Sequence, residues 1–215
     1  MKEYHKIQTV FLRNPDDKYR TLLEGTYSKP EFEYLKDNPW VFTEKVDGTN
    51  IRVMWDGEVV VFGGKTDNAQ IPSFLVARLN DLFYKITKRK IFGDAFGNDG
   101  GVCLYGEGYG AKIQKGGGNY KPDGQDFVLF DVRVGDFWLR REDVEDVASK
   151  FGIGVVPVVG EGTLEEAIEL VRGGLGSTWG SFAAEGLVMR PKTQLFNRMG
   201  ERVITKIKHR DFAER

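Results

Sequence analysis

Apolar and polar side chains alternate in short runs through the first half of the chain, as in strands that bury one face. The first run, residues 40–42, leads almost directly into Lys45. The next two runs, residues 50–55 and 58–62, flank Asp56-Gly57. An Asp-Gly pair between two such runs is a strong hairpin signal. We therefore predict an antiparallel hairpin here, with Lys45 at the margin of a sheet.

Further apolar runs predict strands at residues 101–107, 126–132, 184–190 and 202–208. In the last of these, period-two alternation places Lys206 and Lys208 on one face and Ile207 on the other. Residues 108–125 form a glycine-rich loop. A structureless loop of this length inside a compact domain is usually functional or disordered, and both options stay open from the sequence.

Helical spacing of apolar residues predicts one helix from Ser73, its N-cap, to the basic residues at 85–90, and another over residues 141–151. A third opens at Thr163, because Glu166 stands three places on and completes a capping box. The first helix ends in the basic cluster Lys85, Lys88, Arg89 and Lys90. We expect these cations to complement the helix dipole, with contact to a phosphate backbone as the alternative.

Composition is that of an ordinary globular protein: 215 residues with a formal net charge of −1. This charge argues against indiscriminate coating of nucleic acid, although it allows a local basic groove. The single cysteine, Cys103, lies in an apolar segment and is expected to be a small core residue. No signal peptide or membrane-length apolar run is present. We therefore expect a cytoplasmic protein that does not associate with membranes.

Candidate chemistry centres on the motif Glu44-Lys45-Val46-Asp47-Gly48. A lysine set beside other cations can act as a nucleophile, and the glycine lets backbone approach a ligand closely. The motif alone leaves open an exposed lysine that simply pairs with Glu44 or Asp47. Four other elements, however, also end or centre on a charged or aromatic residue within an apolar strand: Glu107, Phe130 with Asp131, Glu185, and Lys206 with Lys208.

In order, these five elements resemble the covalent nucleotidyltransferases, the superfamily of DNA ligases, RNA ligases and mRNA capping enzymes. This resemblance covers most of residues 40–212. Within the superfamily, the chain is most similar to the phage-type RNA ligase 2 branch. The segments that carry this second likeness are Gly48-Thr49-Asn50, Ile113-Gln114-Lys115, Met189-Arg190-Pro191 and the tail from Lys206 to Phe212.

The resemblance implies an α+β nucleotidyltransferase (adenylation) domain, with two antiparallel sheets around a nucleotide cleft and flanking helices. It also implies ATP-dependent sealing of a 3′-hydroxyl to a 5′-phosphate through lysyl-AMP and polynucleotide-adenylate intermediates. The cofactors would be ATP and Mg²⁺ or Mn²⁺. The partner would be nicked or paired-end RNA, or an RNA/DNA hybrid, bound by a monomer. We expect residues 1–215 to form one catalytic domain, without a separate C-terminal or OB-fold domain.

By the same resemblance, Lys45 would attack the α-phosphorus of ATP. Glu44 would accept a hydrogen bond from the exocyclic amine of adenine, which guanine lacks at that place. Phe130 would stack on the base, and Glu107 would hold the ribose. Gly48 would permit close approach of the nucleotide.

The remaining roles concern charge and the nucleic acid. Lys206 and Lys208 would neutralise the phosphates, and Glu185 with Asp131 would hold the divalent ion. Asp47 would contact the ribose or a metal-bound water; the two options stay open. Lys65, where the family often has arginine, would contact phosphate without a bidentate fork. Asn50 and Arg52 would engage the nucleic-acid end, with a simple turn as the alternative for Asn50.

Three other functions compete with this assignment. A minimal ATP-dependent DNA ligase would also seal DNA-only nicks. A capping enzyme would use GTP, which Glu44 and the absence of an OB-fold in this sequence disfavour. A non-catalytic module that binds nucleic-acid ends would never attach AMP to Lys45.

Overall fold

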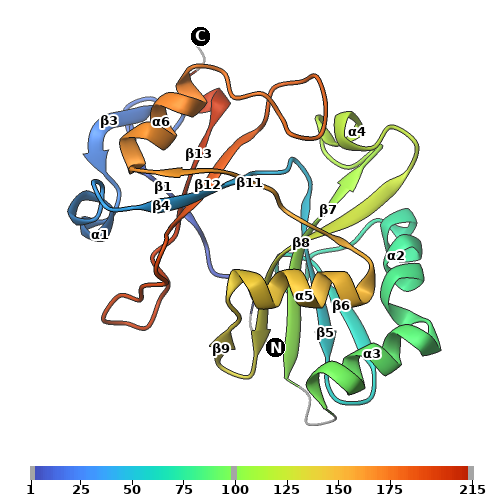
Figure 1. Ribbon diagram of the computed structural model, residues 1–215. Helices are drawn as coiled ribbons and strands as arrows, with labels where there is room; N and C mark the ends of the chain where they lie inside the picture. The colour runs from blue at the N-terminus through green and yellow to red at the C-terminus, as the bar shows by residue number, and fades with distance from the viewer. Residues whose placement is uncertain (1–2, 98–100, 213–215) are drawn as a thin grey trace. The chain divides into compact units, whose positions relative to one another are not determined.

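The computed structural model describes residues 3–97 and 101–212, and its contacts divide the chain into two compact units. The first unit contains the segment up to His5 and the segment Asp47–Val156. The second contains Lys6–Val46 and the chain from Pro157 on. Each unit is built on a large sheet of its own (Figure 1).

The sheet of the first unit has the strand order β10-β8-β7-β5-β6, with β9 added beside β8. Its pairs are antiparallel except for β10, which runs parallel to β8. The strands are β5 (Thr49–Trp55), β6 (Val60–Gly63), β7 (Val102–Gly110), β8 (Gln125–Val134), β9 (Phe137–Trp138) and β10 (Gly154–Val155).

One face of this sheet is covered by helices, which pack around an aromatic cluster that includes Phe83, Phe92, Phe127 and Phe151 (Figure 1). The helical segments of the first unit are α2 (Ser73–Leu79), the π-helical turn η1 (Asn80–Tyr84), α3 (Ile86–Phe96), α4 (Gly117–Tyr120) and α5 (Arg141–Phe151). Cys103 is buried as predicted, and burial raises the pKa of its thiol to about 11.

The sheet of the second unit has the order β1-β13-β12-β4-β11 and is antiparallel except for the pair β1 and β13. Its strands are β1 (Gln8–Thr9), β4 (Trp40–Glu44), β11 (Val158–Gly162), β12 (Gly186–Pro191) and β13 (Thr205–Lys208). A separate pair is formed by β2 (Phe11–Arg13) and β3 (Leu22–Tyr27). The helices are α1 (Pro30–Tyr34), α6 (Leu164–Arg172) and the short 3-10 turn η2 (His209–Asp211).

Helix α6 packs its apolar residues into the core of the second unit, together with Trp40, Leu187 and Ile207. Its N-terminus carries the predicted capping box: Thr163 Oγ1 accepts from the Glu166 backbone N–H, and the Glu166 carboxylate accepts from Thr163 N–H at 2.7 Å. Two large, mostly antiparallel sheets with helices packed against them confirm the predicted α+β fold class.

Several predicted boundaries were wrong. The helix expected from residue 73 to the basic residues at 85–90 is interrupted by η1, so these basic residues lie at the start of α3 rather than at a helix end. Its N-cap is Pro72 and not Ser73. The loop expected over 108–125 is shorter, because β7 extends to Gly110 and α4 forms inside it. The last strand begins at Thr205 and not at residue 202.

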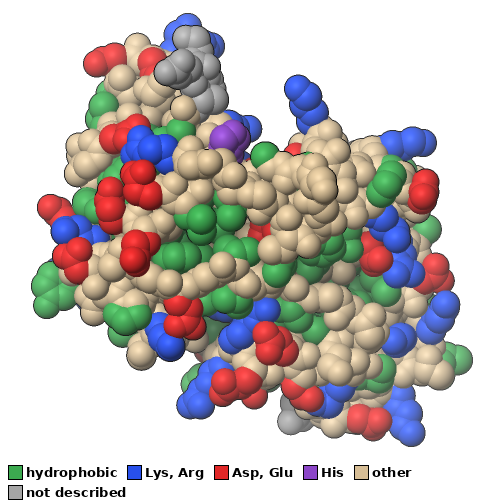
Figure 2. Space-filling view, turned by 45° about the horizontal axis from the view of Figure 1, so that its top comes forward, with side chains coloured by type: hydrophobic (Ala, Val, Ile, Leu, Met, Phe, Trp, Pro, Cys, Tyr) green, Lys and Arg blue, Asp and Glu red, His purple; other side chains and the backbone are tan. Residues whose placement is uncertain are grey.

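Basic and acidic side chains are mixed over the face drawn in Figure 2, without a broad patch of either sign. This distribution agrees with the small net charge of −1. Among the helices of the described residues, none is long and apolar enough to cross a membrane.

Candidate active site

Lys45 follows directly on strand β4, where its backbone N–H donates to the Gly186 carbonyl at 2.9 Å. This bond continues the β4–β12 ladder by one residue and fixes Lys45 beside the start of β12. Its Nζ donates to Glu185 Oε2 at 2.6 Å. From the other side, Lys208 Nζ donates to Glu185 Oε1 at 2.6 Å. Strands β4, β12 and β13 thus bring together two lysines and one carboxylate that are far apart in sequence.

This Lys45–Glu185–Lys208 triad is mostly buried, with side-chain exposures of 21%, 16% and 14%. Desolvation would raise the pKa of Glu185, but the ammonium groups of Lys45 and Lys208 outweigh it and hold that pKa below its ordinary value. Glu185 therefore stays ionised between its two partners. A buried carboxylate of this kind is stable only while its positive partners remain in place.

Lys206 lies on the same face of β13 as Lys208, because Ile207 between them is fully buried in the core. The predicted alternation is thus confirmed. Lys206 stands opposite Val188 in the β12–β13 register, two residues along from the pair Gly186 and Lys208.

Glu44, expected at the adenine amine, is 1% exposed and already bonded on both oxygens. Ser177 Oγ donates to Oε1 at 2.5 Å, and Thr178 donates to Oε2 from its N–H at 2.8 Å and its hydroxyl at 2.7 Å. A carboxylate offers about four lone-pair sites, so these three donors leave capacity for about one more. No sequence pattern pointed to Ser177 or Thr178, which lie in an irregular loop.

In the first unit, β5 and β7 carry a second group of the expected residues. Asn50 pairs with Glu107 and Arg52 with Tyr105, so all four lie on the same face of the sheet. Within the described residues the buried Asn50 Oδ1 finds no hydrogen-bond donor. Gly48, just before β5, lies close to the backbone of β7. A Cβ at this position would lie 2.3 Å from the Gly108 carbonyl oxygen. The need for a glycine at this position therefore comes from the neighbouring strand.

Asp47 contacts the glycine-rich loop. Its Oδ2 accepts a hydrogen bond from the Gly116 backbone N–H at 3.0 Å. This contact fastens the glycine-rich loop to the segment that follows Lys45. The loop is further fixed by Ile113, which is buried in the core between Lys112 and Gln114, two residues with positive φ.

Arg52, which was expected to contact nucleic acid, lies in the interior of the first unit. It is fully buried; its Nε donates to the Gly64 carbonyl at 2.8 Å, and its guanidinium pairs with Asp67 at 2.7 Å. These bonds hold the turn that carries Lys65, whose side chain is exposed. The buried guanidinium presents no surface to a polynucleotide, so in this structure its role is to support the turn.

Phe130 and Asp131 are both contacted by Tyr4. The Tyr4 ring meets Phe130 edge-on with 5.0 Å between centroids, and its hydroxyl donates to Asp131. Asp131 is 2% exposed, which does not favour the expected role as a metal ligand. No group of three or more His, Cys, Asp or Glu side chains in the described part of the chain could hold a metal ion.

Comparison with known proteins assigns the family. The family model described as RNA ligase matches residues 38–208, which includes every candidate residue named above except Tyr4. The chain belongs to the RNA ligase family.

Solved structures similar to this RNA ligase family member include several of the RNA ligase of Naegleria gruberi. A lysine-to-alanine mutant with ATP and Mn aligns with a TM-score of 0.64 at 19% identity, over 97% of this chain and 56% of that one. The same ligase with PPi aligns with a TM-score of 0.61 at 21% identity, over 97% and 58%. The chain thus spans less than two thirds of these structures, and at this identity they support the fold alone. No curated protein sequence matches the chain significantly.

For this RNA ligase family member, sequence reasoning had identified the members of the triad but not the contacts that fix its surroundings. Lys45, Glu185 and Lys208 were expected to act together and do meet. The positions of Ser177, Thr178 and Tyr4 were missed, since none of them lies in a periodic run or a motif. The hydroxyls that hold Glu44 could have been anticipated only from the need of a buried carboxylate for donors.

Proposed function

We propose that the protein is an ATP-dependent RNA ligase that seals 3′-hydroxyl and 5′-phosphate ends. The observation that carries this proposal is the Lys45–Glu185–Lys208 triad, which lies inside the segment matched by the RNA ligase family. A primary amine at a strand end, with a second ammonium group held on the same carboxylate, suits nucleophilic attack on a phosphate.

In the first step, the unprotonated amine of Lys45 would attack the α-phosphorus of ATP. The N–P bond forms as the bond to the β-phosphate oxygen breaks, and pyrophosphate leaves. The AMP would next pass to the RNA 5′-phosphate, which frees Lys45. Attack by the RNA 3′-hydroxyl on that phosphate would then form the phosphodiester and release AMP.

Lys206 and Lys208 would stabilise negative charge on the phosphates from one face of β13. Because Lys208 and Lys45 share Glu185, a bound nucleotide would compete with this carboxylate for both ammonium groups. Partial release of Lys45 from Glu185 would make its amine available for attack.

The residues present fit a magnesium or manganese ion that is held mainly by the nucleotide. Magnesium is usually bound by one or two carboxylates together with substrate phosphates and water, and Glu185 is the carboxylate in contact with Lys45. Such an ion supplies neutralisation of phosphate charge. Glu185 would be the residue of this chain that binds it.

Residues of the first unit would recognise the nucleotide and the RNA. Phe130 would stack on adenine and Glu107 would hold the ribose, while Lys65 would contact phosphate. Asn50, whose buried Oδ1 lacks a donor in the described structure, would accept a hydrogen bond from an RNA 2′-hydroxyl. In the second unit, Glu44, with capacity for one further donor, would accept a hydrogen bond from the adenine amine.

We further propose that residues 1–215 act as one catalytic domain, since the family match extends through both units. The proposed partner is nicked or paired-end RNA bound by a monomer in the cytoplasm. Placement in the phage-type RNA ligase 2 branch remains a prediction from the motifs.

Covalent labelling tests the proposal. Protein freed of any prior AMP by pyrophosphate is incubated with magnesium and α-labelled ATP or GTP, then run on a denaturing gel. We expect label from ATP on wild type and on Lys150→Ala, a control lysine exposed on α5, and none on Lys45→Ala or from GTP. Absence of label on folded wild-type protein would leave a non-catalytic binding module as the better account.

A second experiment distinguishes RNA from DNA as the substrate. Labelled protein receives nicks with ribose or deoxyribose at the 3′ end, because efficient joining of DNA-only nicks would identify a DNA ligase.

A further inference from the structure

A small pocket in the second unit lies where strand β12 ends and the loop to β13 begins. Its polar lining comes from Arg190, Gln194 and Arg202. The loop is closed by a hydrogen bond from Val203 N–H to the Leu195 carbonyl at 2.9 Å and by a bridge between Phe196 and Arg202. The two ends of the loop are thereby held together around the pocket.

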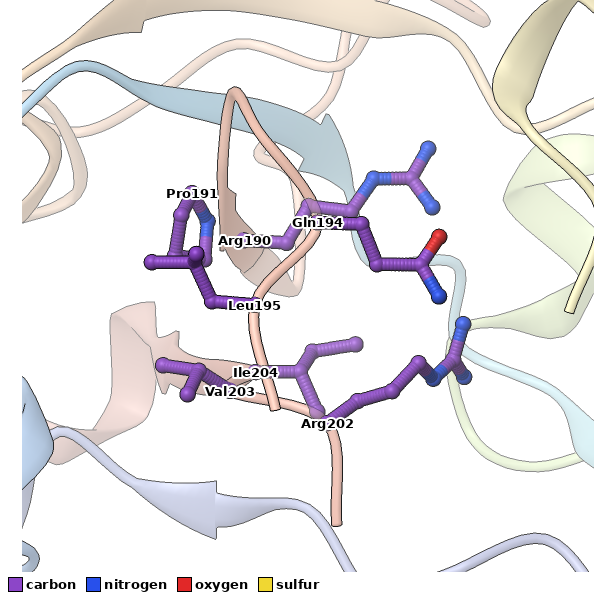
Figure 3. Close-up of a pocket in the computed structure, with 7 residues that line it drawn as sticks. All are labelled: Arg190, Pro191, Gln194, Leu195, Arg202, Val203 and Ile204. Atoms are coloured by element: carbon purple, nitrogen blue, oxygen red, sulfur yellow. The ribbon is translucent and has the colours of Figure 1, made fainter. Parts of the chain in front are cut away.

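The lining side chains are not spread evenly around this pocket, although Ile204 extends towards the polar side (Figure 3). The polar ends of Arg190, Gln194 and Arg202 point to the same side, whereas Pro191 and Leu195 lie on the other (Figure 3). Leu195 and Val203 pack with the core of the unit, which gives the pocket a fixed apolar floor. None of the lining residues is acidic.

The strand register relates this pocket to the triad. Lys208 pairs with Gly186 and Lys206 with Val188, and Arg190 follows two residues later on β12. All three cations lie on the face opposite the buried Leu187, Met189 and Ile207. They form a row along the sheet that starts beside Lys45. At about 3.3 Å per residue, Arg190 lies about 13 Å along β12 from Gly186.

Chemistry selects the class of ligand. Two guanidinium groups repel metal cations, and their planar donor forks match the oxygens of a phosphate. The Gln194 amide can add a further donor. A phosphate bonded to Lys45 would lie too far along β12 to reach this pocket. The anion bound in the pocket would therefore be a different phosphate.

We propose that the Arg190–Gln194–Arg202 pocket binds a backbone phosphate of the RNA strand whose end is joined at Lys45. The inference rests on the proposed function for the identity of the polynucleotide. The row of cations then orients the strand along the sheet, and the pocket fixes its register relative to the triad. A phosphate contact of this kind carries no sequence preference.

The test measures RNA binding without chemistry. A fluorescent, 5′-phosphorylated nicked RNA duplex is titrated by anisotropy, without ATP, at several salt concentrations. The variants are Arg190→Gln and the matched control Arg198→Gln, which removes one exposed arginine from the same loop outside the pocket. For Arg190→Gln we expect about tenfold weaker binding and a salt slope reduced by about 0.7 to 0.9, the contribution of one phosphate. Arg198→Gln should match wild type.

Two further arms complete the test. Arg190→Lys keeps the charge and loses the fork, so it should keep the salt slope while it weakens binding severalfold. Inorganic pyrophosphate and ATP are titrated as competitors of the RNA on wild type and Arg190→Gln. Equal binding and slopes for Arg190→Gln and Arg198→Gln would overturn the proposal, as would an Arg190 effect confined to pyrophosphate or ATP. Failure of Lys45 to take up AMP, with the Arg190 effect on RNA intact, would instead overturn the proposed ligase activity alone.

Discussion

Substitution of Glu185 by glutamine should strongly destabilise the second unit. The side chain keeps its shape but loses its charge, which leaves the ammonium groups of Lys45 and Lys208 together in a site where their side chains are only 21% and 14% exposed. Removal of one partner from a buried ion pair typically costs about 3 to 5 kcal/mol. For a chain of this length, that corresponds to a fall of about 6 to 20 °C in the midpoint of thermal unfolding.

Urea and thermal unfolding measure this loss, with Glu161→Gln as the control. Glu161 bonds Lys192 at 2.7 Å, but their side chains are 48% and 60% exposed, so this surface pair should contribute about 0 to 1 kcal/mol. In the Lys45→Met background the cost of Glu185→Gln should be smaller, because one of the two cations is gone. For Glu185→Gln alone, a loss below about 1 kcal/mol at pH 7 would refute the idea that the triad is a buried, mutually dependent ion cluster.

The effect should also depend on pH. The pKa of Glu185 is lower in the folded protein than its ordinary value of 4.5. Its stabilisation is therefore complete above pH 4.5 and is lost as the pH falls through the folded-state pKa. The difference in stability between wild type and Glu185→Gln should accordingly persist from neutral pH down to about 4.5 and shrink below it. A difference that grew on acidification would contradict the assigned sign.

Two other substitutions test positions at which the structure changed the interpretation. Gly48→Ala should destabilise the first unit by about 1 to 3 kcal/mol, since its Cβ would lie 2.3 Å from the Gly108 carbonyl oxygen. Gly118→Ala, with nothing within 4 Å of its Cβ and a position inside α4, should be neutral or stabilising by about 0.5 to 1 kcal/mol; equal unfolding midpoints for the two variants would argue against the steric explanation. Arg52→Met should cost about 1 to 3 kcal/mol, because the Gly64 carbonyl loses its donor. It should leave the salt slope of RNA binding unchanged, whereas a slope lowered by about 0.7 would restore Arg52 as a phosphate contact.

The parts of the fold that the sequence predicted are those in which a local pattern has a single interpretation. Helix α5 spans residues 141–151 as predicted, since its apolar spacing is regular and Gly152 ends it in the left-handed conformation. The hairpin of β5 and β6 follows from Asp56-Gly57, where the Asp56 carboxylate accepts from the backbone of Glu58 and Val59. The break at η1 was missed, because the same apolar spacing also fits an uninterrupted helix.

Among the site residues, alternation identified the face of each strand but not what covers it. Arg52 does lie on the polar face of β5, beside Asn50. It is nevertheless fully buried, whereas Lys206 on β13 is half-buried. The difference comes from segments packed over each face, such as the turn at Gly64 that accepts from Arg52. The same reasoning applies to Asp131, whose partner Tyr4 is 127 residues away. Contacts at such separations leave no trace in a local pattern.

Glu44 shows how these unforeseen contacts serve the triad. Its carboxylate holds Ser177 and Thr178, in the loop that leads from α6 to Glu185, while the next residue, Lys45, donates to the Gly186 carbonyl. The segment that carries Lys45 and the segment that carries Glu185 are therefore fastened at two points that do not use the Lys45 amine. Side chains in a reactive site must be held in place by neighbours that take no part in the reaction. In the proposed reaction, the Lys45 amine would therefore leave Glu185 for a phosphate without loosening the strands that position it.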